Sequence, residues 1–269
     1  MNPPTAAELA ADAELAFLAL YAEDAFAMNR AAPKPDPRLS PDWTILGTLT
    51  AQDAIMGPGT LRLAQERVFY GWLLHGPHGF VVAIRGTESV LEWLIDCEFA
   101  QMTPHSAGGA VESGFWSVYE TLEIDGKPFK SVADMVNGLV AIVGHSLGAA
   151  VATYAALDLA QAGAEVQGRF IASPHPGNGA FSAAFGRAVP DHRMYRNMDD
   201  AVPRVPFWFG YCAVPNVEKL DAAEEGVEIS GGLAGQHHVL SYSALMSRAT
   251  FEAFRPLPID QKFVECVKF

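Results

Sequence analysis

The residues most clearly arranged for chemistry form the pentapeptide Gly144-His145-Ser146-Leu147-Gly148. A serine hydroxyl becomes a useful nucleophile when a sharp turn from a strand into a helix exposes it beside a base. The two glycines permit such a turn because they place no side chain where the strand and the helix approach each other. The backbone N–H groups at the start of the helix would also attract a developing oxyanion. The pentapeptide therefore predicts Ser146 as the nucleophile of an acyl-transfer reaction.

The flanking sequence supports this interpretation over an ordinary strand-to-helix loop. Residues 139–143 are wholly apolar, as in a strand buried on both faces of a parallel sheet. Residues 147–162 are rich in alanine and leucine, which are strong helix formers. A buried strand, the pentapeptide and a helix thus follow one another, which is the context that the motif requires.

A serine hydrolase of this kind needs an acid and then a histidine later in the chain, each after a further strand. The histidines that follow Ser146 are His175, His192, His237 and His238. Only the last two lie beyond a plausible acid, next to the glycine-containing segment 231–236, which we expect to be a flexible loop. This argument leaves the choice between His237 and His238 open.

The elements around these residues predict an α/β fold with a central, mostly parallel sheet and helices on both faces. Residues 5–29 have apolar positions at helical spacing, and four prolines between residues 33 and 41 predict an extended connector. Residues 67–74 and 80–84 predict a β-hairpin, and strands alternate with helices as far as residue 197. We expect one domain over residues 1–269, with an amphipathic N-terminal helix inside residues 1–32 that packs on the body.

Composition excludes several classes of partner. The formal charge of −13 disfavours nucleic acid, whose binding needs lysine and arginine. No apolar run is long enough to span a bilayer.

The three cysteines have no metal-ligand spacing and allow at most one internal disulfide. We expect no metal and no cofactor. The N-terminus lacks the order of a signal peptide, which predicts a cytoplasmic protein unless a leader was removed and the protein is secreted.

Several separated motifs together resemble the class 3 lipases, the fungal-lipase-like family of α/β-hydrolases. They occur in the family's order and cover the chain from about residue 67 to residue 245. The matching segments are Ile84-Arg85-Gly86-Thr87-Glu88-Ser89, Trp93 with Asp96, Gly114-Phe115, Ser173-Pro174 with Gly177-Asn178, and residues 197–206. The sequence departs from the family's pattern at Glu112, where a histidine is frequent, and at His175, where an arginine is expected.

The resemblance implies roles for individual residues. Asp200 corresponds to the family's acid because it stands two residues before Val202-Pro203, whereas Asp199 stands three before. His237 is implied as the base because Tyr242 follows it by five residues, and His238 remains the alternative.

The same resemblance implies an oxyanion hole made of the backbone N–H groups of Leu147 and Thr87, with the Thr87 hydroxyl as a third donor. The acidic composition further predicts that His237 favours its protonated form, so that turnover rises towards mildly alkaline pH.

Residues 88–96 form a short amphipathic segment, with acidic side chains on one side and Val90 and Leu94 on the other. In class 3 lipases the corresponding segment is a lid that opens at lipid interfaces. The resemblance therefore implies a lid here, with Trp93 against the acyl chain and transient contact with a lipid interface. A helix docked permanently on the core is the equally weighted alternative.

The sequence as a whole predicts a serine ester hydrolase, a lipase or carboxylesterase of lipid degradation, that cleaves neutral acyl esters such as acylglycerols. Phospholipase A1 and feruloyl-type esterase are the enzyme alternatives. A catalytically silent scaffold that binds a ligand or partner is the non-enzyme alternative, because a fold does not guarantee chemistry.

Overall fold

A nine-stranded mixed sheet forms the centre of the computed structural model, which describes residues 3–28, 42–57, 60–87, 100–208, 210–257 and 260–269. Its strand order is β13-β11-β9-β8-β3-β2-β1-β6-β7, and the first five of these strands are parallel to one another. The strands are β1 Thr44–Gly57, β2 Thr60–Gly76, β3 Gly79–Ile84, β6 Glu123–Ile124, β7 Lys127–Pro128, β8 Val140–His145, β9 Val166–Ile171, β11 Asp191–Asn197 and β13 Val217–Leu220.

Two smaller sheets and the helices complete the described part of the chain. The small sheets join β4 Gln101–Met102, β5 Val111–Glu112, β10 Gly177–Asn178 and β12 Tyr211–Cys212, and β14 Glu228–Ile229 with β15 Val267–Lys268. The α-helices are α1 Ala6–Met28, α3 Ser113–Glu120, α4 Leu147–Gln161, α5 Gly179–Ala188, α6 Gly232–His237, α7 Val239–Met246, α8 Arg248–Phe254 and α9 Gln261–Val264. Short 3₁₀ turns occupy His105–Ala107, Phe129–Asp134 and Val202–Arg204.

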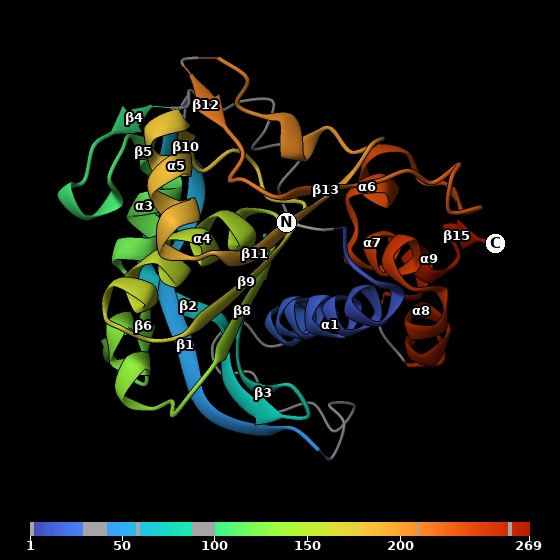
Figure 1. Cartoon of the computed structure of the whole chain (residues 1–269), viewed down its shortest axis with the longest axis horizontal. Helices are drawn as coiled ribbons and strands as arrows, with labels where there is room; N and C mark the ends of the chain where they lie inside the picture. The colour runs from blue at the N-terminus through green and yellow to red at the C-terminus, as the bar shows by residue number, and fades with distance from the viewer. Residues whose placement is uncertain (1–2, 29–41, 58–59, 88–99, 209, 258–259) are drawn as a thin grey trace.

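Helices cover both faces of the sheet, as the sequence predicted. Helices α3, α4 and α5 lie on one face, and α1, α7 and α8 lie on the other (Figure 1). Side chains of a strand point alternately to the two faces. In β3, Val82 and Ile84 therefore join the core under α4, whereas Val81 and Ala83 join the core under α1. This alternation makes two apolar cores, one on each side of the sheet.

Most elements lie where the sequence predicted them. The hairpin is β2 with β3, the apolar run before the pentapeptide is β8, and the helix after it is α4. The prediction of a flexible loop over residues 231–236 was wrong, because Gly232–His237 is a short helix. Gly231 and Gly232 both adopt positive φ at its start, and Gly235 lies so close to Ser230 that an added Cβ would stand 1.9 Å from its carbonyl oxygen. The glycines here permit tight packing. The predicted connector over residues 33–41 lies outside the described residues.

Helix α1 is not amphipathic in the way that its spacing predicted. Every residue from Leu15 to Ala22 is buried. Helices α7 and α8 cover the side of α1 that faces away from the sheet, so that no side of this stretch meets water (Figure 1). A helix that is buried all round needs apolar residues all round.

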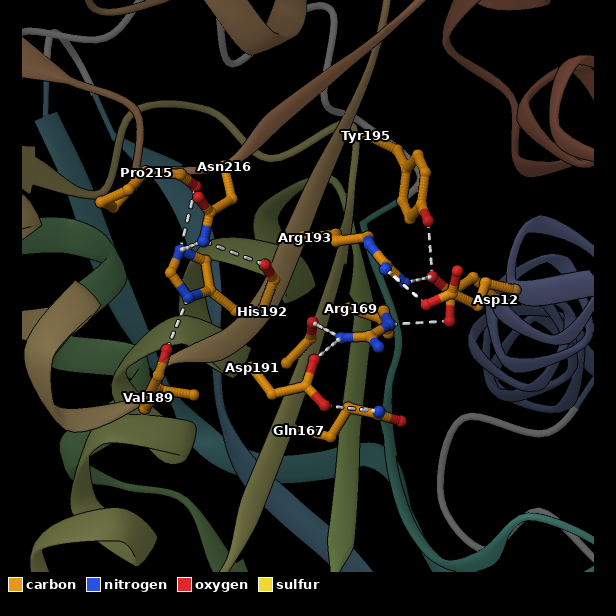
Figure 2. A network of polar contacts seen from close by, with 12 residues as sticks. Asp12, Gln167, Arg169, Val189, Asp191, His192, Arg193, Tyr195, Pro215 and Asn216 are labelled. Atoms are coloured by element: carbon orange, nitrogen blue, oxygen red, sulfur yellow. Dashed lines mark hydrogen bonds and ion pairs between the residues drawn. The ribbon is translucent and has the colours of Figure 1, made fainter. Parts of the chain in front are cut away.

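Buried charges fix α1 to the sheet. Asp12 accepts a hydrogen bond from Nε of Arg169 at 2.7 Å and also bonds Arg193 and the hydroxyl of Tyr195 (Figure 2). The three partners come from β9 and β11, and all four side chains are buried. At the start of the helix, Glu8 pairs with Arg193 at 2.7 Å. Because a buried charge is costly unless it is paired, this network fixes where α1 lies on the sheet.

Candidate active site

Ser146 lies in a sharp turn between β8 and α4. Its backbone has φ 56° and ψ −128°, a conformation that is strained for a residue with a side chain. If Gly144 carried a Cβ, that atom would stand 2.4 Å from the carbonyl oxygen of Gly148. A Cβ on Gly148 would stand 2.0 Å from the carbonyl oxygen of Arg85. Both glycines are therefore required by close backbone approach. Leu147 is the first residue of α4, so its N–H has no intrahelical acceptor.

Asp200 lies in the segment after β11, and His237 is the last residue of helix α6; the fold brings the two together. Oδ2 of Asp200 lies 2.7 Å from Nδ1 of His237 and also accepts a hydrogen bond from the Tyr242 hydroxyl at 2.8 Å. Oδ1 of Asp200 accepts from the N–H of Val202 at 2.9 Å. Asp200 is completely buried, whereas Asp199 is exposed. Of the two neighbouring aspartates, Asp200 is thus the one that orients a histidine.

The remaining ring nitrogen of His237 and the hydroxyl of Ser146, the predicted nucleophile, both lack a hydrogen-bond partner among the described residues. Nε2 of His237 and Oγ of Ser146 are both buried. Such bonds are frequently long in an enzyme without substrate. The ring of His237 lies 4.8 Å, between centroids, from the ring of His145, the residue next to Ser146.

The other histidines have different contacts. His238 accepts a hydrogen bond from Leu240 N–H at the start of α7, contacts Asp260 through Nε2 at 3.1 Å, and stacks on Phe263. Both of its ring nitrogens are therefore engaged away from Asp200. His175 and His192 bond backbone carbonyls at other places and do not join the pair.

Gly86 and Thr87 follow β3 and lie beside the pentapeptide. Nη1 of Arg85 donates to the carbonyl oxygen of Gly86 at 2.6 Å, and its Nε donates to the carbonyl of Phe69 at 2.7 Å. Because the peptide group is planar, fixing the Gly86 carbonyl also fixes the direction of the Thr87 N–H. The guanidinium of Arg85 stacks on the rings of Phe26 and Tyr70, at 3.5 and 4.4 Å.

Glu23 and His145 are two site residues that sequence reasoning missed. Oε1 of Glu23 accepts from the N–H of Gly86 at 2.8 Å and lies 2.7 Å from Nδ1 of His145. Nε2 of His145 lies 2.9 Å from the carbonyl oxygen of His237. The available signal was an acidic pair, Glu23-Asp24, inside an otherwise apolar helical stretch.

The pKa of His237 shifts in the opposite direction from the one that composition predicted. Burial lowers it below its ordinary value, although the charge and hydrogen bond of Asp200 oppose this shift. The overall charge of the protein matters less here because the local loss of water destabilises the imidazolium. His237 is thus held neutral, the form that can accept a proton.

A cavity of about 450 Å³ opens beside Thr87 and His237. Its opposite wall consists of α1 and the C-terminal segment, and its lining includes Asp24, His238 and Lys262. Ser146 is not among the residues that line this cavity.

The two departures from the family pattern are structural. Glu112 is buried and accepts a hydrogen bond from the N–H of Phe115 at 2.7 Å, which caps α3. Burial raises the pKa of Glu112 to about 7. Nδ1 of His175 bonds the carbonyl of Pro206 at 2.8 Å. Neither side chain contacts Asp200 or His237 in the hydrogen bonds of the described residues.

The predicted lid over residues 88–96, with Val90, Trp93 and Leu94, lies outside the described residues. Cys212 and Cys266 are free thiols. Within the described ranges, no group of three or more His, Cys, Asp or Glu residues is placed to hold a metal ion. In the same ranges, no helix is both long and apolar enough to cross a membrane.

Comparisons with known proteins agree with this geometry. Residues 81–210 match the family model for class 3 lipases. The secreted mono- and diacylglycerol lipase A of Penicillium cyclopium is 38% identical over 136 residues, which cover 49% of this chain and 44% of that protein. Phospholipase A1-II 7 of Oryza sativa subsp. indica is 33% identical over 171 residues, which cover 49% of this chain and 42% of that protein. The chain thus covers less than half of the length of these curated relatives.

The solved structure of a mutant form of MDLA from Penicillium cyclopium superposes with a TM-score of 0.60 at 24% identity, covering 81% of this chain and 82% of that one. This likeness confirms the predicted α/β-hydrolase fold. The cytoplasmic location that the N-terminus predicted finds no support, because the name of the first relative describes a secreted protein. Residues 81–210, which contain the pentapeptide and most of the parallel strands, thus resemble the class 3 lipases in sequence.

Proposed function

We propose that this protein is a serine ester hydrolase that cleaves neutral acyl esters, with acylglycerols as its main substrates. Ser146 is the nucleophile, His237 the base and Asp200 the acid that orients it. The observation that carries the proposal is the hydrogen bond between Asp200 and His237, in a fold that also holds Ser146 in a strained turn. The class 3 lipase segment supports the same reaction.

In the proposed mechanism, Ser146 Oγ attacks the ester carbonyl while Nε2 of His237 takes its proton. The carbonyl oxygen becomes an oxyanion that the N–H groups of Leu147 and Thr87 stabilise, with the Thr87 hydroxyl as a further donor. His237 then gives the proton to the departing alkoxide and leaves an acyl-enzyme. Water, activated by the same histidine, attacks the acyl group and releases the acid. Asp200 stabilises the imidazolium in both halves of the cycle.

The substrate class follows from the relatives and from the charge of the protein. Among the relatives is a mono- and diacylglycerol lipase, and a net charge of −13 favours uncharged substrates over anionic ones. Phospholipase A1 activity is the second candidate, because relatives with that name match about the same share of the chain. A feruloyl-type esterase stays a prediction with no specific support.

Three further expectations remain part of the proposal. Residues 1–269 act as one α/β-hydrolase domain, and residues 88–96 act as a lid that lets Trp93, Val90 and Leu94 contact the acyl chain. The protein touches lipid interfaces transiently. We also propose that it acts outside the cytoplasm, in agreement with the name of its Penicillium relative.

The deciding experiment measures hydrolysis of p-nitrophenyl esters of increasing chain length by the wild type and by Ser146→Ala. We expect the wild type to turn over these esters and the variant to lose activity by several orders of magnitude. Equal activity of the two proteins, or none in the wild type, would favour the silent-scaffold alternative. Monoacylglycerol, diacylglycerol and phosphatidylcholine, offered as separate emulsions, then rank the acylglycerol and phospholipase A1 proposals by the rate of fatty acid release.

A further inference from the structure

Glu23 is an unexpected residue for the inner side of helix α1. It follows the stretch from Leu15 to Ala22 in which every side chain is buried, and its own side chain is 23% exposed. Both described contacts of its Oε1 atom go to the site: to the N–H of Gly86 and to the ring of His145. One oxygen of α1 thus contacts both the segment after β3 and the last residue of β8.

We propose that Glu23 and His145 form a positioning pair that holds the Gly86-Thr87 segment and the end of helix α6, which carries His237, in fixed positions around Ser146. This inference rests on the proposed function. It assigns to the N-terminal helix a part in catalysis that lies outside the triad and outside the oxyanion donors.

The oxyanion side of the pair acts through Gly86. Glu23 fixes the N–H of Gly86, and Arg85 fixes its carbonyl oxygen, so both peptide groups that flank Gly86 are held. The second of these peptide groups carries the N–H of Thr87, the proposed donor. Phe26, one helical turn after Glu23, stacks on the guanidinium of Arg85 at 3.5 Å. Helix α1 therefore supports the Thr87 N–H from two of its side chains.

The base side of the pair acts through the backbone of His237. Nε2 of His145 lies 2.9 Å from the His237 carbonyl oxygen, while Asp200 holds the other end of the same residue, its ring. Asn197 adds a hydrogen bond to the carbonyl of Gln236 at 2.9 Å. His237 is consequently fixed at its backbone and at its Nδ1 atom, which leaves Nε2 as its free functional atom.

The contacts of His145 define its protonation. A carbonyl oxygen can only accept a hydrogen bond, so Nε2 must carry a hydrogen, and the carboxylate of Glu23 requires another on Nδ1. His145 is therefore an imidazolium paired with a carboxylate. The positive charge of His145 and the negative charge of Glu23 cancel. The pair therefore holds Gly86 and His237 without placing a net charge beside His237.

Two conservative substitutions separate the effect of the length of the Glu23 side chain from the effect of its charge. In Glu23→Gln the amide oxygen can still accept from the N–H of Gly86, while His145 loses its counter-charge, becomes neutral and keeps the hydrogen on Nε2 that the His237 carbonyl accepts. In Glu23→Asp the charge remains, but the shorter side chain cannot reach both partners. For a soluble ester, we expect Glu23→Asp to lower kcat by about tenfold or more with KM nearly unchanged, and Glu23→Gln to stay within about threefold of the wild type.

A tetrahedral analogue gives an independent readout. A methyl trifluoromethyl ketone forms an oxyanion on Ser146, so its affinity should fall in Glu23→Asp by about the same factor as kcat. Loss of stability alone would lower the amount of active protein without changing that affinity per active site. His145→Asn, which keeps a donor towards Glu23 and removes the one towards the His237 carbonyl, should also lower kcat.

The matched controls are Glu14→Asp and Glu14→Gln, the same changes on the same helix at an exposed residue that pairs with His78. The proposal is overturned if Glu23→Asp keeps the wild-type kcat, if Glu14→Asp lowers kcat as much, or if Glu23→Gln falls as far as Glu23→Asp. An unchanged kcat in His145→Asn also overturns it. Because the wild type and Ser146→Ala are assayed alongside, failure of the esterase proposal is recognised separately by the absence of wild-type turnover.

Discussion

The phenol of Tyr242 donates a hydrogen bond at 2.8 Å to Oδ2 of Asp200, the same oxygen that orients the ring of His237. Tyr242→Phe removes this donor and leaves the carboxylate in a fully buried place. We expect the free energy of unfolding to fall by about 1.5–3 kcal/mol, because hydrogen bonds to charged groups are worth that much. Urea denaturation measures the change. A loss below about 0.5 kcal/mol would mean that the bond adds little.

Asp200 and Asp199 offer a direct comparison between neighbouring carboxylates. Asp200→Asn should lower kcat by about three to four orders of magnitude, because an amide can donate to Nδ1 and stabilise the wrong tautomer of His237. Asp199→Asn changes an exposed side chain and should leave kcat within about twofold. Steady-state hydrolysis of a soluble ester checks both. A larger loss in Asp199→Asn would reassign the acid.

Burial of His237 predicts the acidic limb of the pH profile. The base acts in its neutral form, and burial lowers its pKa. Turnover should therefore rise with pH and reach half of its maximum below about pH 6.5, the ordinary value for histidine. The measurement is kcat/KM for a soluble ester between pH 4 and 9, with unfolding monitored at each pH. A midpoint clearly above neutrality would instead support the acidic-field prediction made from composition.

Gly148 has no room for a side chain. A Cβ there would stand 2.0 Å from the carbonyl oxygen of Arg85, directly before the Gly86-Thr87 segment. We expect Gly148→Ala to cost about 1–3 kcal/mol of stability and to lower kcat by about a hundredfold, because displacement of the Gly86-Thr87 segment misplaces its donor. Gly179→Ala is the control, since an added Cβ meets nothing within 4 Å. Thermal unfolding and ester hydrolysis should separate the two variants.

Glu112 makes stability depend on pH. Its pKa is raised from 4.5 to about 7 by burial, so the folded protein keeps a proton that the unfolded chain releases. Stability from this group is therefore full below about pH 4.5 and is lost as pH rises through 7. Glu112→Gln keeps an acceptor for Phe115 and cannot ionise. Its free energy of unfolding should match the wild type near pH 5 and exceed it by about 1–3 kcal/mol at pH 8. A constant difference between these pH values would contradict the account.

Sequence reasoning was most successful where chemistry and backbone geometry leave few options. The turn at Ser146 needs two glycines, a buried strand and a helix, and all of these are contiguous in the chain. The resemblance to class 3 lipases then supplied Asp200 and His237 by their local motifs. The structure places these two side chains in a hydrogen bond, while their catalytic roles stay predictions.

The parts that escaped prediction depend on contacts between distant segments. Glu23 and His145 are 122 positions apart, and nothing in the sequence near either residue indicates the other. The direction of the pKa shift at His237 was not predicted for a similar reason. Net charge is a sum over the whole chain, whereas this pKa depends on the local burial of the ring. In segment 231–236 the glycines suggested a loop. Gly235 is instead required by its close packing against Ser230.

The attachment of α1 to the sheet determines when the site can form during synthesis and folding of the chain. During synthesis this helix leaves the ribosome before the strands on which it packs, because Arg169 follows Asp12 by 157 positions and His237 follows later still. Contacts of such long sequence separation make folding slow. A nascent chain that already contains Ser146 thus still lacks His237, and its helix α1 is not yet fixed on the sheet. If the proposed activity holds, we expect the chain to stay inert towards the lipids of the cell that makes it until the segment that carries His237 has been synthesised and folded.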